Sequence, residues 1–137
     1  MSKEIKKVLL AMGNEAKKSS QKLALASAEQ KNKSLHYMAD NIDQNVSNIL
    51  DANNKDIARA KENNISQSFL DRLILNEERI KSMSDGLRSI ASLEDPIGQK
   101  MAKWQRPNGL DIEWVRTPLG VIGVIYDSRP NVTADAG

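Results

Sequence analysis

The sequence predicts the front portion of a larger α/β protein, from three features of its hydrophobic pattern. Up to about residue 95, apolar residues recur every three or four positions, which is typical of amphipathic helices. From residue 110 the interval shortens to two, which is typical of a half-exposed strand. The run "LGVIGVIY" at 119–126 is then almost continuously apolar, as in a parallel strand covered on both faces.

A parallel strand at 119–126 needs a partner that follows a crossover of about a dozen residues or more. The tail "NVTADAG" is long enough to begin such a crossover helix, but it is too short to return to the sheet. We therefore expect this strand to be the first of a sheet whose other strands lie beyond residue 137.

The helical part is predicted to contain five segments. The first covers about residues 5–26 and the second about residues 35–50, each with one apolar face. A shorter third segment surrounds "KDIARAKENN", where Asn63 and Asn64 tolerate the left-handed backbone of a helix end.

Capping residues mark the last two helices. Ser66 is expected to be the N-cap of the fourth segment, "SQSFLDRLIL", and Asn76 the N-cap of the fifth. Glu77 and Glu78 favour the positive end of the fifth helix dipole. The residues Asp95–Pro96 are expected to end that helix, because the residue before a proline avoids helical backbone angles.

A long connection rich in Pro, Gly and Asn is predicted at 95–109. In "LDIEWVR", the apolar residues Leu110, Ile112 and Trp114 alternate with acidic ones, so we expect a half-exposed strand that ends at Thr117–Pro118. The chain then divides into a helical region at 1–95, a connection and strand at 96–118, and a first sheet strand with its loop at 119–137.

The composition excludes several classes of protein. Twenty Lys and Arg against eighteen Asp and Glu give the 137 residues a formal charge of +2, and only 4% are aromatic. Because the basic residues are mixed with acidic ones, the basic stripe of a nucleic-acid-binding protein is missing. With no cysteine and one histidine, we expect neither disulfides nor a metal site such as zinc. No apolar stretch reaches the roughly 18 residues of a membrane span or suits a signal peptide, so we expect a cytoplasmic protein without a membrane partner.

The loop after the predicted strand is the expected functional region, because ligands of open α/β sheets bind beyond the carboxyl ends of the strands. It offers a carboxylate at Asp127, a hydroxyl at Ser128, a guanidinium at Arg129 and a carboxamide at Asn131. The glycines of "LGVIGV" do not form a dinucleotide-binding fingerprint, which needs a third glycine at the start of a helix.

Several motifs together resemble one family. "RTPLGVIGVIYDSRPNVTADAG" is similar to the signature of the γ-glutamyl phosphate reductases (glutamate-5-semialdehyde dehydrogenases) of the aldehyde dehydrogenase superfamily. "NNKDIARAKENNISQSFLDRLILNEERIKSMSDGLRSIASLEDPIG" and "RPNGLDIEWVR" resemble the same family in the same order. The resemblance covers nearly the whole chain. It implies an aldehyde-dehydrogenase-like fold, with an N-terminal helical region, a β-arm strand and the first strand of a Rossmann-like NADP-binding domain that is incomplete in this chain.

The resemblance implies NADPH-dependent reduction of L-glutamyl 5-phosphate to L-glutamate 5-semialdehyde, with release of phosphate, in proline biosynthesis. In this family a cysteine thiolate attacks the acyl phosphate, and hydride from NADPH reduces the thioester. The family's cysteine lies well downstream of the matched motifs, and this chain contains none. We therefore expect the 137 residues alone to be inactive.

The resemblance also implies roles for two polar residues of the loop. Asn131 corresponds by order to a superfamily Asn that donates its side-chain N–H to the developing oxyanion; alternatively, Asn131 or Thr133 caps the helix that follows. Arg129 can bind the phosphate or the α-carboxylate of the substrate through two parallel hydrogen bonds; alternatively, it pairs with Asp127 or Asp135.

Cofactor contacts are expected through the main chain of Ile125, Tyr126, Asp127 and Ser128, which resembles the stretch along the nicotinamide in the superfamily. The residues that distinguish NADPH from NADH at the adenosine ribose are expected beyond residue 137. The small-molecule substrate and the cofactor are therefore the predicted ligands.

Partner chains are predicted from the arm that joins subunits in the superfamily. Trp114 lies in the corresponding strand, so we expect a homo-oligomer through this β-arm, with ordinary packing of Trp114 as the alternative. A different hypothesis for the whole chain is a non-enzymatic amphipathic helical interaction module whose last strand adds to a partner's sheet. Two further features are expected to be structural: His36 as a surface residue and Asp71–Arg72 as an ion pair between helices.

Overall fold

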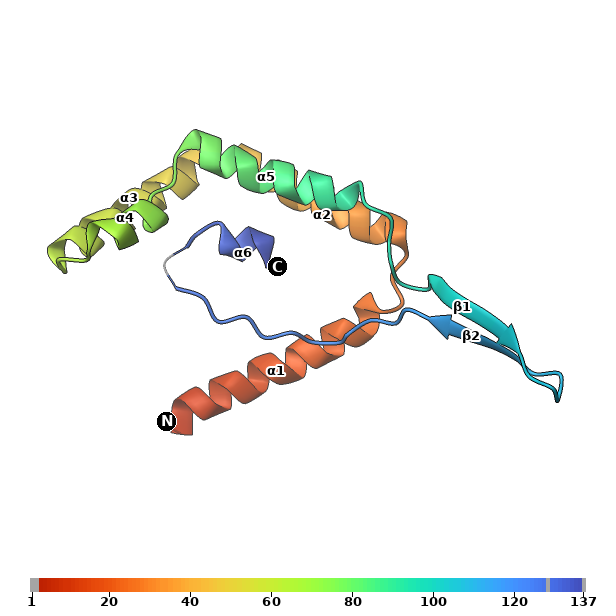
Figure 1. The fold of residues 1–137 in the computed structure, drawn as a ribbon. Helices are drawn as coiled ribbons and strands as arrows, with labels where there is room; N and C mark the ends of the chain where they lie inside the picture. Colours follow the sequence, from red (N-terminus) through yellow and green to blue (C-terminus); the bar gives the residue numbers. More distant parts are fainter. Residues whose placement is uncertain (1–2, 128, 137) are drawn as a thin grey trace. The chain divides into compact units, whose positions relative to one another are not determined.

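The computed structural model describes residues 3–127 and 129–136, and these divide into two compact units. One unit consists of Met1–Ser27 and Glu94–Gly123, and the other of Ala28–Leu93 and Val124–Gly137. The elements along the chain are α1 (Lys3–Leu23), α2 (Ala28–Gln44), α3 (Val46–Glu62), α4 (Gln67–Leu73), α5 (Glu77–Ala91), β1 (Lys100–Gln105), β2 (Asp111–Val115) and α6 (Val132–Asp135) (Figure 1).

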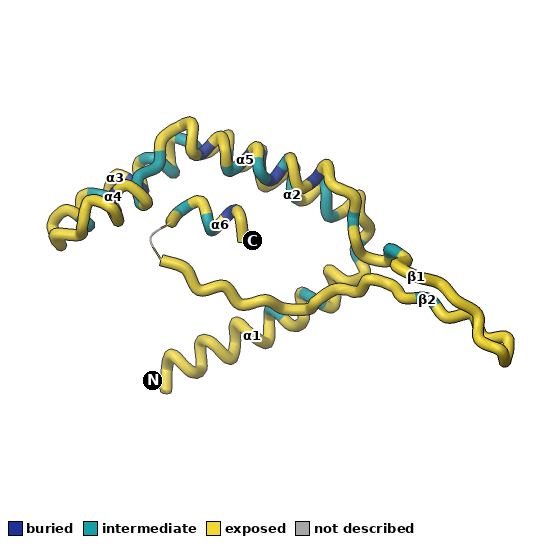
Figure 2. The backbone as a smooth tube through the Cα atoms, in the orientation of Figure 1, coloured by how far each residue is buried: buried dark blue, intermediate teal, exposed yellow. Residues whose placement is uncertain are grey.

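The second unit is a group of paired helices. Helix α2 packs along α5, α3 contacts α4 and α5, and α6 contacts α5 (Figure 1). The buried residues of this pair include Ala39 on α2 and Ile80, Ser84 and Leu87 on α5, and Figure 2 marks buried positions along the paired helices. The predicted apolar face of α5 is buried only in part, because Ile80 and Leu87 are buried whereas Ile90 is 47% exposed.

Charged side chains reinforce the contact between α2 and α5. The guanidinium of Arg88 on α5 lies 2.8 Å from a carboxylate oxygen of Asp40 and 2.7 Å from one of Asp43, both on α2. The Ser84 hydroxyl, and then Arg88, lower the pKa of the Asp43 carboxyl by hydrogen bonding. The same hydroxyl donates to the carbonyl oxygen of Lys81 at 2.9 Å.

The helix predicted over 35–50 is instead two helices that meet at Asn45. The side-chain amide of Asn45 donates to the Asn41 carbonyl at 2.9 Å, and its oxygen accepts from Asn48 at 3.1 Å. Side-chain amides compete in this way with the main-chain bonds of a helix, which favours a break. Helix α3 then continues through the third predicted segment, and Asn64 has the predicted left-handed backbone, with a φ of 54°.

The predicted caps are confirmed in part. The side-chain oxygen of Asn76 accepts the main-chain N–H of Arg79 at 2.7 Å, as expected for an N-cap of α5. Ser66 holds the N-cap position of α4, but its side chain makes no capping hydrogen bond and lies 3.1 Å from the Ser68 hydroxyl. Helix α5 ends at Ala91, before the predicted stop at Asp95–Pro96.

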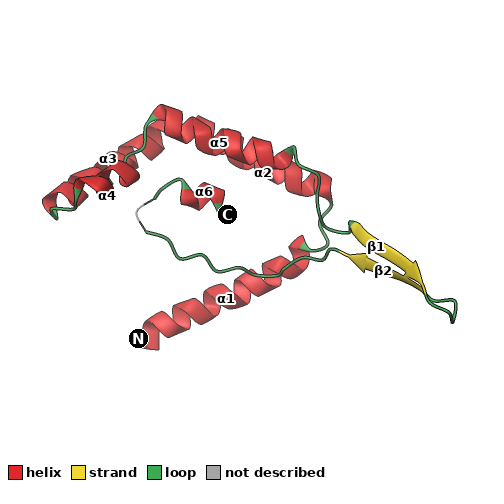
Figure 3. Cartoon of the chain, in the orientation of Figure 1, coloured by secondary structure: helices red, strands yellow, loops and turns green. Residues whose placement is uncertain are grey.

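In the first unit, β1 and β2 form an antiparallel hairpin (Figure 3). The strand predicted at "LDIEWVR" is therefore confirmed as β2, whereas the stretch at 95–109, predicted to be a long connection, contains the strand β1. The turn between the strands contains Gly109, whose φ of 85° is readily adopted by glycine. Directly opposed residues share a face of the hairpin, and the register pairs Ala102 with Trp114 and Trp104 with Ile112.

The two faces of the hairpin therefore differ in chemistry. The opposite face carries Lys103 paired with Glu113 and Gln105 paired with Asp111. Lys100 also binds Glu113 at 2.8 Å and lowers the pKa of its carboxyl through that hydrogen bond. One face is thus apolar and the other is laced with ion pairs, yet Trp114 on the apolar face is 65% exposed.

Residues 116–127 form neither helix nor strand, so the predicted parallel strand at 119–126 is not formed in this structure (Figure 3). Its apolar side chains are exposed, and Ile125 is fully so. A strand exists only as part of a hydrogen-bonded ladder, and no main-chain hydrogen bond joins residues 119–126 to another described residue.

Helix α1 has an apolar stripe whose side chains are more than half exposed. Ile5, Val8, Leu9 and Met12 recur at helical spacing, and none of the residues of α1 is buried. None of the helices in the described ranges is both long and apolar enough to cross a membrane.

Candidate active site

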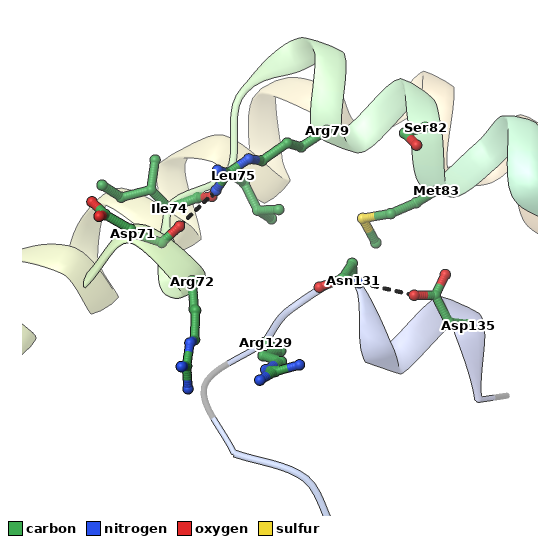
Figure 4. Close-up of a pocket in the computed structure, with 10 residues that line it drawn as sticks. All are labelled: Asp71, Arg72, Ile74, Leu75, Arg79, Ser82, Met83, Arg129, Asn131 and Asp135. Carbon is green, nitrogen blue, oxygen red and sulfur yellow. Dashed lines mark hydrogen bonds between the residues drawn. The ribbon is translucent and has the colours of Figure 1, made fainter. Parts of the chain in front are cut away.

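A pocket of about 600 Å³ lies in the second unit, between α4, α5 and the segment around α6 (Figure 4). Its volume falls within the range of small-molecule sites. Charged and amide side chains line much of it, together with Met83 and the short connection between α4 and α5. The lining residues are Asp71, Arg72, Ile74, Leu75, Arg79, Ser82, Met83, Arg129, Asn131 and Asp135.

One wall of the pocket is held by a buried amide. The side chain of Asn53 on α3 donates to the carbonyl of Leu73 at 2.8 Å and accepts from the N–H of Leu75 at 2.9 Å. Asn53 is only 5% exposed. A buried amide that satisfies two main-chain groups in this way pins the connection between α4 and α5 in one conformation.

A second clamp acts on the same connection from α5. The guanidinium of Arg79 donates to the main-chain carbonyls of Asp71 and Ile74 (Figure 4). The last carbonyls of a helix have no partner within the helix. Arg79 supplies one for α4, so its role in this pocket is to hold the backbone.

Asn131 lies on the pocket, where the sequence predicts a catalytic amide. Its side-chain nitrogen donates to the Asp135 carboxylate at 2.8 Å (Figure 4). Asn131 occupies the N-cap position of α6, but its side chain caps no main-chain N–H, so the prediction that it acts as a side-chain cap is wrong. Thr133 lies inside α6 and its hydroxyl is 2.8 Å from that of Tyr126, so it is not the cap either.

Arg129 stands between two hollows of this unit. Besides the pocket above, it lines a second hollow of about 540 Å³ with Ile125, Tyr126, Asp127 and Val132. Its guanidinium is 3.6 Å from the Asp127 carboxylate, a loose ion pair between half-exposed side chains. The predicted pairing with Asp127 is therefore present, although the distance is longer than that of a strong charged hydrogen bond.

The remaining predicted contacts lie beside this second hollow. Ile125, Tyr126 and Asp127 line it, and their contact with a cofactor stays a prediction. Ser128 lies outside the described residues. Within the described ranges, no group of three or more His, Asp or Glu side chains could hold a metal ion.

The prediction that Asp71–Arg72 forms an ion pair between helices is wrong. The Asp71 carboxylate accepts from the Gln67 amide of its own helix at 2.9 Å. The Arg72 guanidinium instead lies over the ring of Phe69, 5.5 Å from its centre. Both residues line the pocket, and no local pattern in "FLDRLIL" indicates this, because a charged pair on a short helix is most often a solvated face.

Comparison with known proteins connects this arrangement to a family. No family model matches the chain. Along all 137 residues it is 54% identical to the γ-glutamyl phosphate reductase of Brucella suis biovar 1, of which it covers 32%. Over 130 residues, 95% of the chain, it is 55% identical to the γ-glutamyl phosphate reductase of Allorhizobium ampelinum, of which it covers 30%.

Solved structures agree. The crystal structure of γ-glutamyl phosphate reductase from Thermotoga maritima matches 93% of this chain with a TM-score of 0.90 and 38% identity, and the match covers 31% of that protein. The one from Saccharomyces cerevisiae matches 88% of the chain with a TM-score of 0.84 and 34% identity, again over 31% of its length. The α-rich fold with a two-stranded sheet is thus a fold found in this family. The chain spans about a third of the length of these relatives, and its resemblance to the N-terminal portion of the γ-glutamyl phosphate reductase family is confirmed.

Proposed function

We propose that the protein containing this chain reduces L-glutamyl 5-phosphate to L-glutamate 5-semialdehyde with NADPH, releases phosphate, and serves proline biosynthesis in the cytoplasm. The observation that carries the proposal is the 54% identity along the whole chain to a γ-glutamyl phosphate reductase. That similarity includes the strand, the loop and the helices alike, which favours the enzyme over a non-enzymatic helical module.

The residues at the pocket suit the anionic groups and the reacting acyl group of such a substrate. A guanidinium such as Arg129 binds a phosphate or carboxylate with paired hydrogen bonds. Asn131 has a second amide N–H beyond the one that Asp135 accepts, and this N–H is available for the acyl oxygen as negative charge develops there. In this proposal Asp135 is a positioning residue, because its hydrogen bond orients the carboxamide.

The segment before the loop suits a cofactor that is read through main-chain atoms. The N–H and C=O groups of residues 119–126 make no main-chain hydrogen bond with any described residue. They are therefore available to form a sheet and, at residues 125 and 126, to meet the nicotinamide. The Asp127 carbonyl instead accepts the main-chain N–H of Arg129 at 2.7 Å. NADPH would supply the hydride. The thiol nucleophile would come from outside this chain, which has no cysteine.

The hairpin suits the proposed β-arm between subunits. Its apolar face carries two exposed tryptophans, Trp104 and Trp114, flanking Ile112. Tryptophan is enriched at protein interfaces. We place the contact of a homo-oligomer on this face.

The proposed reaction is tested in reverse on the protein that contains this chain. We expect phosphate-dependent oxidation of L-glutamate 5-semialdehyde coupled to reduction of NADP, followed by absorbance of the reduced nicotinamide. Asn131→Ala should lower kcat by roughly 100- to 1,000-fold, which is typical for loss of one oxyanion donor. Asn54→Ala, an exposed change on α3, is the control and should leave the rate unchanged.

Absence of phosphate-dependent turnover by the wild-type protein would contradict the reaction. Full activity of a folded Asn131→Ala variant would contradict the role of Asn131 while leaving the reaction in place.

A further inference from the structure

Within the described part of the chain, Arg72 differs from the other charged residues of the pocket in having no oxygen partner. Arg79 donates to two main-chain carbonyls, and Arg129 faces Asp127 at 3.6 Å. The carboxylates of Asp71 and Asp135 each accept from a neighbouring amide. For the Arg72 guanidinium, by contrast, the described residues provide only the face of the Phe69 ring.

Contact with the ring leaves the hydrogen-bonding edge of Arg72 available. A guanidinium over an aromatic ring is held by cation–π attraction through its flat face, while its N–H groups point outward in the plane. In Figure 4, Arg72 extends from α4 and Arg129 from the loop before α6 toward the same side of the pocket. Two guanidiniums from separate elements thus border one opening.

Side chains from α3 and α5 hold the backbone around Arg72 in place. Asn53 binds the carbonyl of Leu73 and the N–H of Leu75, and Arg79 binds the carbonyls of Asp71 and Ile74. These four main-chain groups flank residue 72 on both sides. Such support is what a binding side chain needs, because affinity and selectivity depend on preorganisation.

We propose that Arg72 binds the α-carboxylate of the amino-acid substrate and so determines specificity for substrates that carry one. This inference rests on the proposed function, in which the substrate has an anionic group at each end. Arg129 lies two residues from Asn131, so it belongs to the end that reacts and holds the phosphate. Arg72 comes from a different element, α4, and in this proposal it binds the α-carboxylate at the other end of the substrate.

The test compares two aldehydes in the phosphate-dependent oxidation by the protein that contains this chain. L-Glutamate 5-semialdehyde carries the α-carboxylate, and butanal does not. For Arg72→Gln we expect kcat/KM for glutamate semialdehyde to fall by roughly 10- to 100-fold, mainly through KM, because one charged hydrogen-bonded pair is lost. The same variant should change kcat/KM for butanal by less than about twofold.

Two matched variants complete the experiment. Arg72→Lys keeps the charge but loses the paired geometry, so its loss should lie between those of the wild type and Arg72→Gln. Arg59→Gln removes an arginine of α3 that does not line the pocket, and it should behave as wild type with both aldehydes. An equal fall with both aldehydes, or no fall with either, would overturn the inference while the proposed reaction stands.

A binding measurement separates this inference from the proposed function. Glutarate, a dicarboxylate, is titrated calorimetrically into wild-type and Arg72→Gln protein. If the wild type turns over neither aldehyde, the proposed reaction is wrong. Weaker glutarate binding by Arg72→Gln than by the wild type would still support an anion site at Arg72. Equal binding by the two proteins, or no binding by the wild type, would overturn the inference.

Discussion

Asn53 shows how a single residue can shape a site from which it is separated in sequence. Its amide satisfies two main-chain groups of the connection between α4 and α5, and it is buried while doing so. The sequence contains a signal for it, because Asn53 follows Ile49 and Leu50 at helical spacing and so interrupts an apolar face. A polar residue on such a face usually has a specific partner.

We predict that Asn53→Leu destabilises the protein by about 1–3 kcal/mol, because a partly buried N–H and a partly buried carbonyl lose their partners. The neighbouring Asn54 is exposed, and Asn54→Leu should change stability by less than about 0.5 kcal/mol. Urea unfolding, followed by circular dichroism, measures both variants. Equal midpoints for the two would show that the Asn53 hydrogen bonds contribute nothing to stability.

The positions of the pocket arginines also differ in how far the sequence predicts them. Arg129 lies in the predicted loop and is found at the pocket. Arg72 and Arg79 lie on helices, where a charged residue is most often solvated, and only the fold shows that one is stacked on a ring and the other holds carbonyls.

At the scale of elements, the pairing of α2 with α5 combines a buried apolar stripe with a charged cluster at its edge. Hydrogen bonds from Ser84 and Arg88 lower the folded-state pKa of Asp43 below its ordinary value of 3.8. A lowered pKa means that the contribution of Asp43 to stability is fully present above the ordinary pKa and is lost as pH falls through the folded value.

We therefore predict that the urea midpoint falls as pH is lowered from about 5 to about 3, and that Asp43→Asn weakens this dependence. Asp51 on α3 is exposed and serves as the control, since Asp51→Asn should retain the wild-type dependence. The measurement is a series of unfolding curves across this pH range. If the urea midpoint of Asp43→Asn depends on pH as strongly as that of the wild type, other carboxylates are responsible for the pH dependence.

The hairpin is the element that could have been predicted more fully. The run "KMAKWQ" alternates apolar and polar residues from Ala102 to Gln105, and "PNG" precedes a second alternating run. An Asn-Gly pair between two such runs is a strong hairpin signal. The Pro, Gly and Asn content of 95–109 predicted a connection instead, but Pro96 and Gly98 precede β1 and Pro107, Asn108 and Gly109 lie in the turn after it.

At the scale of the whole molecule, the exposed apolar face of the hairpin leads to a prediction about assembly. Trp114→Glu should convert an oligomer into smaller species, because it places a charge in the proposed contact. Gln105→Glu adds the same charge to the opposite, ion-paired face and should leave the oligomer intact. Size-exclusion chromatography with light scattering measures both. A monomeric wild type, or an unchanged oligomer in Trp114→Glu, would contradict the proposed β-arm contact.

By itself, the sequence determined where most helices lie, the second strand of the hairpin, the cap at Asn76 and the family resemblance. These are properties of neighbouring residues, since spacing along the chain decides which side chains share a face and which main-chain groups a cap can reach. Tertiary structure alone decided that Asn53 holds the α4–α5 connection, that Arg72 and Arg129 border one pocket, and that residues 119–126 stay without a ladder. These depend on contacts between distant segments, and a strand or a pocket exists only when a second segment supplies its other side.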